Sequence, residues 1–177
     1  TMLQAADETI HGISVDPMQY YLDELPNRRN VIKYCAGISD TFVKDAPLYF
    51  IPPKFIDECD HLPVWLKGCN SFFEPHCQHG PYQDIIQCVH VDLITFSQLI
   101  DKFSVRSINN MRLDCEGMDL TILNGIYDQY KSGQLTVLPV HIDIEVYLSN
   151  IWTIPPYVHP DKFRVTIDKL KQIGYTL

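Results

Sequence analysis

The sequence predicts an α/β domain in which helices cover a mainly parallel sheet. Short β-branched runs alternate with amphipathic helical segments, a pattern typical of strand–helix–strand units. The 177 residues are 46% hydrophobic and 20% charged, which is enough apolar material for one core, and no repeat or linker divides them. We therefore expect one doubly wound domain over residues 1–177.

The first elements are two strands with a helix between them. Residues 10–15 and 31–38 are apolar runs of strand character. Over residues 16–25 the apolar side chains recur at helical spacing, and a proline stands where it suits the first helical turn. A third strand is expected over residues 47–51, before two prolines interrupt it.

Residues 52–84 show little periodicity and contain several prolines and glycines, so we expect a long loop. Long loops in compact domains are commonly lids or binding loops. Aromatic and polar side chains are mixed in its centre, which suits a pocket wall, and we expect it to overhang the carboxyl ends of the strands. These side chains are Trp65, Asn70, Ser71, Phe72, Phe73 and His76.

The second half continues the alternation. Strands are expected over residues 85–92 and 111–114, and Thr95 with Gln98 forms a capping box for a helix that reaches Phe103. In the next helix the expected buried stripe is Leu120, Leu123, Tyr127 and Tyr130, and Gly133 ends that helix.

A strand over residues 138–146 and a helix over residues 160–173, ended by Gly174, complete the expected fold. The strand alternates cleanly between two faces. Val140, Ile142, Ile144 and Val146 lie on one face, and His141, Asp143 and Glu145 lie on the other.

The segment 113–119, LDCEGMD, places two carboxylates and a glycine where a strand meets a helix. Ligands of open α/β sheets bind at the carboxyl ends of the strands. Asp114 and Glu116 are therefore candidate site residues. The alternative is structural: they cap the helix that begins near Gly117, or pair with Arg112 or a lysine.

A formal net charge of −8 and a pI near 5.2 argue against broad binding to nucleic acid, which needs clustered Lys and Arg. No apolar run approaches the roughly 20 residues that span a bilayer, and the first residues lack the pattern of a secretory signal. We expect an intracellular protein whose partners are small molecules or other proteins.

Three of the six cysteines, Cys35, Cys88 and Cys115, lie in or beside apolar strands, where we expect them to act as small core residues in a reducing compartment. The others lie near several histidines in the long loop. Their spacing matches no paired zinc motif, so we expect ordinary loop residues and no metal. This second group is Cys59, Cys69 and Cys77, with His61, His76 and His79.

The order of five segments resembles the FkbM-type methyltransferases, and the similarity covers nearly the whole chain. These segments are ISVDP, YCAGISD, VHVDLITFSQLIDKF, MRLDCEGMDLTILNGI and VHIDIEV. The most specific part is the Asp-x-Glu-Gly turn. The resemblance implies a Rossmann-like class I fold, S-adenosylmethionine as methyl donor, and a hydroxylated small molecule or sugar as acceptor.

The resemblance also implies the donor site. Asp16, which ends a strand, corresponds to the carboxylate that accepts hydrogen bonds from the ribose hydroxyls. The residues leave open that Asp16 caps the helix at Pro17, and both roles can coexist. Ser39 and Asp40 correspond to the adenine-binding region.

Asp114 and Glu116 resemble the acidic pair near the transferred methyl group, where Asp114 also contacts the donor. A carboxylate there can remove the hydroxyl proton as attack develops. His141 and Glu145 share a face of the last strand and are further candidates for the base, although a lone strand histidine is more often structural. Acceptor specificity would rest on the long loop and on residues 152–159.

One element of the family is missing: a first, central strand followed by a glycine-rich turn. The eight glycines are dispersed, so we expect the strands at residues 13–15 and 111–114 to flank an empty place without pairing. Either the missing element lies upstream of Thr1, or this is a methyltransferase-like domain that binds a partner without catalysis. A third reading is metal-dependent hydrolysis by Asp114, Glu116, Asp143 and His141.

Overall fold

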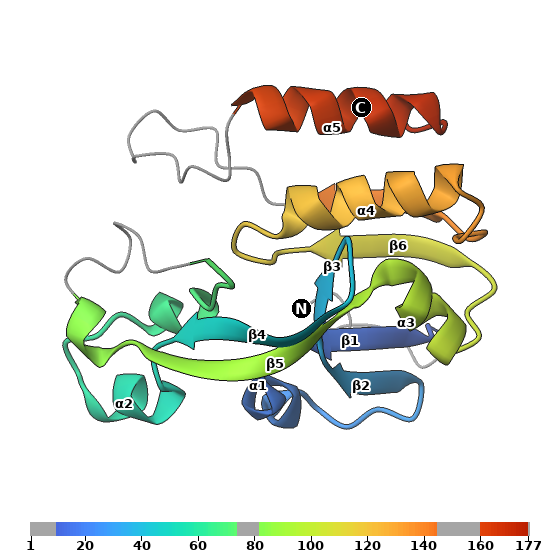
Figure 1. The fold of residues 1–177 in the computed structure, drawn as a ribbon. Coiled ribbons are helices and arrows are strands. Elements are labelled where there is room, and N and C mark those ends of the chain that lie inside the picture. Colours follow the sequence, from blue (N-terminus) through green and yellow to red (C-terminus); the bar gives the residue numbers. More distant parts are fainter. Residues whose placement is uncertain (1–9, 74–81, 145–159, 177) are drawn as a thin grey trace.

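The computed structural model describes residues 10–73, 82–144 and 160–176, and Figure 1 shows its mixed α/β architecture. The strands are β1 Gly12–Asp16, β2 Val31–Cys35, β3 Gly37–Ser39, β4 Val43–Phe50, β5 Gln87–Thr95, β6 Ile108–Leu113 and β7 Pro139–Ile144. The helices are α1 Gln19–Glu24, α2 Pro53–Glu58, α3 Phe96–Lys102, α4 Asp119–Lys131 and α5 Pro160–Gln172, with a short 3-10 helix, η2, at Val64–Gly68.

The described strands form three small sheets. β1 pairs with β2 and β6 pairs with β7, both in parallel, while β5 lies between β3, its parallel partner, and β4, its antiparallel partner. The expected strand over residues 31–38 is thus divided at Ala36 into two strands that belong to different sheets. Most of the pairing is parallel, as predicted, and the long β4–β5 ribbon is the exception.

β1 and β6 do not pair with each other, which confirms the expectation for these two strands. Ile13 pairs with Ile32, and Leu113 pairs with Ile144, so each strand pairs along one edge within the described residues. Even so, Val15 of β1 packs against the same core cluster as the strand residues of β6. The two sheets therefore share one hydrophobic core although no hydrogen bond joins their strands.

Helix α4 is the centre of that core and lies between β6 and α5 (Figure 1). Its side chains Ile122, Leu123 and Ile126 are fully buried. The stripe expected from the sequence was only partly right, because Tyr130 is 39% exposed and the buried face turns toward Ile122 and Ile126. A helix covered by strands on one side and by α5 on the other buries a wider face than a single stripe.

The buried amide of Gln129 joins α4 to two other elements. Its Oε1 accepts a hydrogen bond of 3.0 Å from the backbone N–H of Ser97, in the first turn of α3. Its Nε2 donates one of 3.2 Å to the carbonyl of Asp40, just after β3. Both ends of a buried side-chain amide are thereby satisfied, as burial requires.

The prediction of one structureless loop over residues 52–84 was wrong, because α2 and η2 lie within it. The two prolines that suggested a break instead begin α2, where a missing N–H costs nothing. Ile51, Ile56, Leu62 and Leu66 form a second, smaller buried cluster there. Short helices held by such a cluster show no repeating apolar period, so the sequence pattern did not reveal them.

Local signals were more reliable. Thr95 and Gln98 form the expected capping box of α3, and Gly133 and Gly174 have positive φ values just after their helices. One burial prediction was wrong: Cys35 and Cys88, expected to act as core residues, are exposed. Cys35 ends β2, and Cys88 lies near the start of β5, so both stand at strand ends and not in the middle of the core.

A Gly125→Ala substitution tests the packing of α4 against β3. An added Cβ would lie 2.6 Å from the Cα of Asp40, a backbone atom that no side-chain rotation can move. We expect the free energy of unfolding, measured with urea, to fall by about 1–3 kcal/mol despite the higher helix propensity of alanine. Gly68→Ala is the control, since no atom lies within 4 Å of its added Cβ. Equal stabilities of the two variants would contradict this packing.

Candidate functional site

The ends of β1 and β6 bring the predicted acidic residues to one edge of the fold. Asp16 ends β1, and Asp114 directly follows β6. Cys115 follows Asp114, and its pKa is raised to about 12, first by burial and then by the carboxylates of Asp119, Asp114 and Asp16. Val15, before Asp16, and Cys115, after Asp114, pack against the same core cluster, so the two strand ends lie on one core.

Asp16 has one oxygen engaged in local structure. Its Oδ1 accepts a hydrogen bond of 2.7 Å from the N–H of Met18, which fixes the turn before α1. The capping role that the sequence left open is therefore present. Burial raises the pKa of this half-buried carboxyl, while the Met18 bond lowers it. Among the described residues Oδ2 has no hydrogen-bond partner, so it can still accept a bond from a ligand.

The turn after β6 has two consecutive residues in the left-handed region, Glu116 with φ 44° and Gly117 with φ 104°. Asp119 stabilises this turn from the start of α4. Its Oδ1 accepts a hydrogen bond of 3.4 Å from the N–H of Cys115. Burial raises the Asp119 pKa, and backbone hydrogen bonds from the turn lower it. The sequence analysis missed Asp119, although an acidic residue in a first helical turn was a usable signal.

Neither Asp114 nor Glu116 occupies the N-cap position of α4. Met118 is the N-cap of α4, and no side-chain hydrogen bond caps it. The alternative pairing with Arg112 is present but weak, since Arg112 Nη2 lies 4.0 Å from Asp114 Oδ2 and both side chains are largely exposed. The Asp114 carboxylate is thus accessible at the edge where β6 ends.

The long segment after β4 does reach this edge, as predicted. Ser71 is buried, and its Oγ donates a hydrogen bond of 3.0 Å to the carbonyl of Glu116. Ser71 is held in place by two backbone hydrogen bonds with Tyr49, of 2.8 and 3.0 Å. Trp65, by contrast, is 58% exposed on η2, and His76 lies outside the described residues.

A buried polar pair lies beside Asp16. The Tyr21 hydroxyl and Asn70 Oδ1 are both buried without a hydrogen-bond partner among the described residues. Burial raises the Tyr21 pKa, the neighbouring Asn70 amide lowers it, and the Asp16 carboxylate raises it. No sequence pattern connects these two residues, because α1 and the segment after η2 meet only in the folded chain.

Ser39 and Asp40 occupy a different position. Ser39 is buried and its Oγ donates a hydrogen bond of 3.1 Å to Asp40 Oδ1, while the Asp40 backbone packs on Gly125 and bonds Gln129. These contacts lie about 9–15 Å along α4 from its first residue, at 1.5 Å per residue. The structure therefore does not bring these two residues against the acidic turn.

His141 is also separated from the turn. It is exposed on β7 and pairs with Asn110, four positions before Asp114, which corresponds to about 13 Å along the strand. Among the residues described, no three His, Cys, Asp or Glu side chains are arranged to hold a metal ion, so the hydrolase reading gains no support. Glu145 and the cluster of His76, Cys77 and His79 lie outside the described residues, as do residues 152–159.

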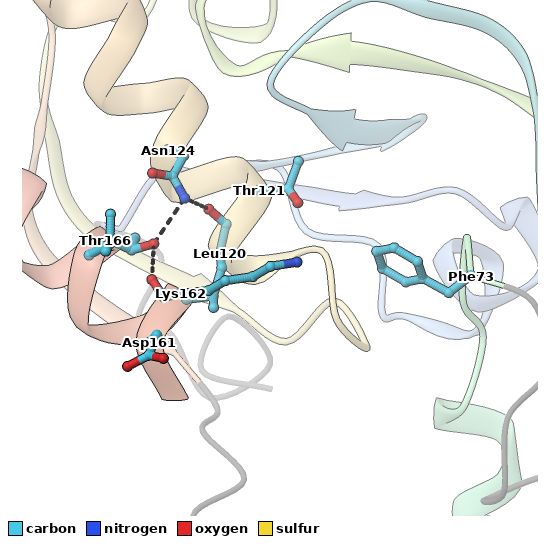
Figure 2. Close-up of a pocket in the computed structure, with 8 residues that line it drawn as sticks. Phe73, Leu120, Thr121, Asn124, Asp161, Lys162 and Thr166 are labelled. Carbon is cyan, nitrogen blue, oxygen red and sulfur yellow. Dashed lines mark hydrogen bonds between the residues drawn. The ribbon is translucent and has the colours of Figure 1, made fainter. Parts of the chain in front are cut away.

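A hollow of about 360 Å³ opens beside the acidic turn, between the first turns of α4 and α5 (Figure 2). Phe73 faces it from the segment after η2. Its lining combines apolar and polar side chains. They are Phe73, Leu120, Thr121, Asn124, Asp161, Lys162, Val165 and Thr166.

Comparison with known proteins gives one finding for nearly the whole chain. The family model described as the methyltransferase FkbM domain matches residues 6–177. No curated protein and no solved structure matches the chain significantly. Within the described part of the chain, no helix is both long and apolar enough to cross a bilayer.

An Asp119→Asn substitution tests the cost of burying this carboxylate. Since the pKa is raised in the folded state, the unfolded chain loses its proton first as pH increases. The free energy of unfolding therefore falls with pH from about pH 4 until the folded-state pKa is passed. Asparagine removes this fall and keeps an acceptor for Cys115, so we expect a variant more stable than the parent near neutral pH, with no advantage near pH 3.

Urea unfolding at several pH values measures this difference. Asp101→Asn, which removes one negative charge from an exposed position of α3, is the control for net charge. Part of the fall with pH remains in the Asp119 variant, because the Asp16 pKa is shifted in the same direction. A variant less stable than the parent at every pH would show that the carboxylate charge itself stabilises the turn.

Proposed function

Because the chain belongs to the FkbM methyltransferase family, we propose that it transfers a methyl group from S-adenosylmethionine to a hydroxyl group of a small molecule or sugar. One observation carries the proposal beyond the family: Val15, next to Asp16, packs against the same core cluster as Leu113 and Cys115 on either side of Asp114, and both carboxylates raise the pKa of the Cys115 thiol. A donor-binding carboxylate and an accessible carboxylate for proton transfer are thereby neighbours.

The residues near Asp16 fit the ribose of the donor. Two adjacent hydroxyls need acceptors, and Asp16 Oδ2 has no other partner among the described residues. The orphaned Tyr21 hydroxyl and Asn70 Oδ1 beside it are further polar atoms that a bound ligand can satisfy. Ser39 and Asp40 are proposed for the adenine on the resemblance alone, since their contacts here are with α4.

The proposed reaction is an in-line displacement. The donor supplies an electrophilic methyl carbon on a sulfonium; the hydroxyl oxygen bonds to this carbon as the C–S bond breaks, and the electron pair stays on sulfur. Asp114 accepts the hydroxyl proton, with Glu116 as the alternative base and His141 as a more distant one. Asp119 and Ser71 position the turn that carries both carboxylates, through the Cys115 amide and the Glu116 carbonyl.

We also propose a Rossmann-like sheet with the strand order β2–β1–x–β6–β7, in which x stands for a central strand. The strand x is one that the described residues do not provide. Three observations support its place. Among the described residues β1 and β6 each pair along one edge, both strands pack against the same core, and the carboxylates at their ends both raise the pKa of the Cys115 thiol. Unpaired strand edges are strong templates for another strand.

Asp16→Asn tests donor binding. Asparagine keeps an acceptor for the Met18 amide but loses the charge that strengthens bonds to ribose hydroxyls, so we expect calorimetry to show roughly tenfold to 100-fold weaker binding of S-adenosylmethionine. Asp23→Asn, which changes an exposed carboxylate of α1, should bind like the parent. If the unmodified protein does not bind the donor, the proposed donor site at Asp16 is contradicted. If Asp16→Asn binds S-adenosylmethionine as tightly as the parent does, Asp16 serves only to stabilise the turn before α1.

Asp114→Asn tests proton transfer. We expect turnover to fall by a factor on the order of 100, the usual scale for a positioned acid–base group, with unchanged stability. Stability should hold because Asp114 does not cap α4. Arg112→Gln is the control, since an exposed pair at 4.0 Å contributes little. An Asp114→Asn protein with normal turnover would shift the role of base to Glu116 or His141.

A further inference from the structure

The hollow between α4 and α5 has the size and position of an acceptor site. Its volume of about 360 Å³ lies within the range of small-molecule sites. Ser71 connects it to the acidic turn, because the Ser71 Oγ donates to the Glu116 carbonyl and accepts a bond of 3.3 Å from the Phe73 N–H. Leu120 and Thr121 belong to the first turn of α4, directly after that turn.

The lining offers partners for hydroxyl groups and for a carbon ring. Asn124 Nδ2 donates to the Leu120 carbonyl at 2.7 Å and to Thr166 Oγ1 at 2.9 Å, which fixes the side chain and leaves Oδ1 as an acceptor (Figure 2). The Thr121 hydroxyl lies on the same side of the hollow as this amide. Phe73 faces them and presents an apolar surface.

Two charged side chains line the hollow: Asp161, whose carboxylate lies 3.9 Å from Arg164, and Lys162. The other basic residues of α5 each have an acidic neighbour, in the pairs Arg164–Asp161, Lys169–Asp128 and Lys171–Asp168, at 3.9, 3.7 and 4.0 Å. No carboxylate among the described residues lies within ion-pair distance of Lys162. Its side chain extends from α5 toward Thr121 and Phe73 (Figure 2).

We propose that this hollow binds the methyl acceptor, and that the acceptor is a hydroxylated small molecule carrying one carboxylate or phosphate group. Lys162 binds the anion, Phe73 packs on the carbon face of the ring, and Thr121 and Asn124 bind hydroxyls. In a chain of net charge −8, an ammonium group that faces a hollow selects an anion that the rest of the surface repels. The inference rests on the proposed function only in calling the ligand the acceptor.

Ligand-observed NMR on the full chain tests the site without requiring turnover. The probes are glucuronate, glucose 6-phosphate and neutral glucose, which share a hydroxylated ring and differ in charge. We expect at least one anionic probe to bind, more weakly at high salt, and glucose to bind less well. Lys162→Gln should weaken the anionic probe about tenfold and leave glucose unchanged. Lys169→Gln, a lysine of the same helix that lies over Tyr127, is the matched control.

Preference for glucuronate identifies a carboxylate acceptor, and preference for glucose 6-phosphate identifies a phosphate acceptor. The inference is overturned if neither anion binds, if glucose binds equally well, or if Lys162→Gln and Lys169→Gln have the same effect. A parallel titration with S-adenosylmethionine separates this outcome from the proposed function. If the donor binds but Lys162→Gln does not weaken binding of the anionic probe, only the acceptor site is contradicted. If the anionic probe binds but the donor does not, the acceptor site stands and the methyltransferase proposal is contradicted.

Discussion

The amide of Gln129 is the interaction on which the arrangement of the described elements depends. Three small sheets have few hydrogen bonds in common, so α4 must hold them together by packing and by side-chain contacts. Gln129 binds the start of α3 and the end of β3 at once, and both of these elements adjoin β5. A buried side-chain amide left without these partners would cost its full desolvation energy, so the contact also specifies where α4 lies.

Features that depend on neighbouring residues could be predicted from the sequence. The capping box at Thr95 and the stop at Gly133 are set by hydrogen bonds and backbone angles within a few residues. Helices α2 and η2 were missed because a small cluster around Leu66 stabilises them, not their own periodicity. The face of α4 was partly mistaken for the same reason, since α5 covers a side that an isolated stripe would leave in water.

The candidate site divides in the same way. Asp16 and Asp114 could be expected to meet because parallel strands end at a common edge. The contact of Ser71 with Glu116, and that of Tyr21 with Asn70, join segments far apart in the chain and have no local signal. Ser39, Asp40 and His141 follow or lie on strands as expected, yet their contacts are with the far half of α4 and with the middle of β6.

The register of the strands also has a consequence for the order of folding. Gly12 pairs with Val31 and Ile108 pairs with Pro139, each across a single helix, so these two units close short loops and form early. Gly37 pairs with Leu93 across a much longer stretch of chain, so closing this loop costs more conformational entropy. The edge that carries Asp16 and the acidic turn is thus built from two units whose strand pairing spans a short stretch of chain, whereas the sheet of β3, β5 and β4 depends on more distant contacts.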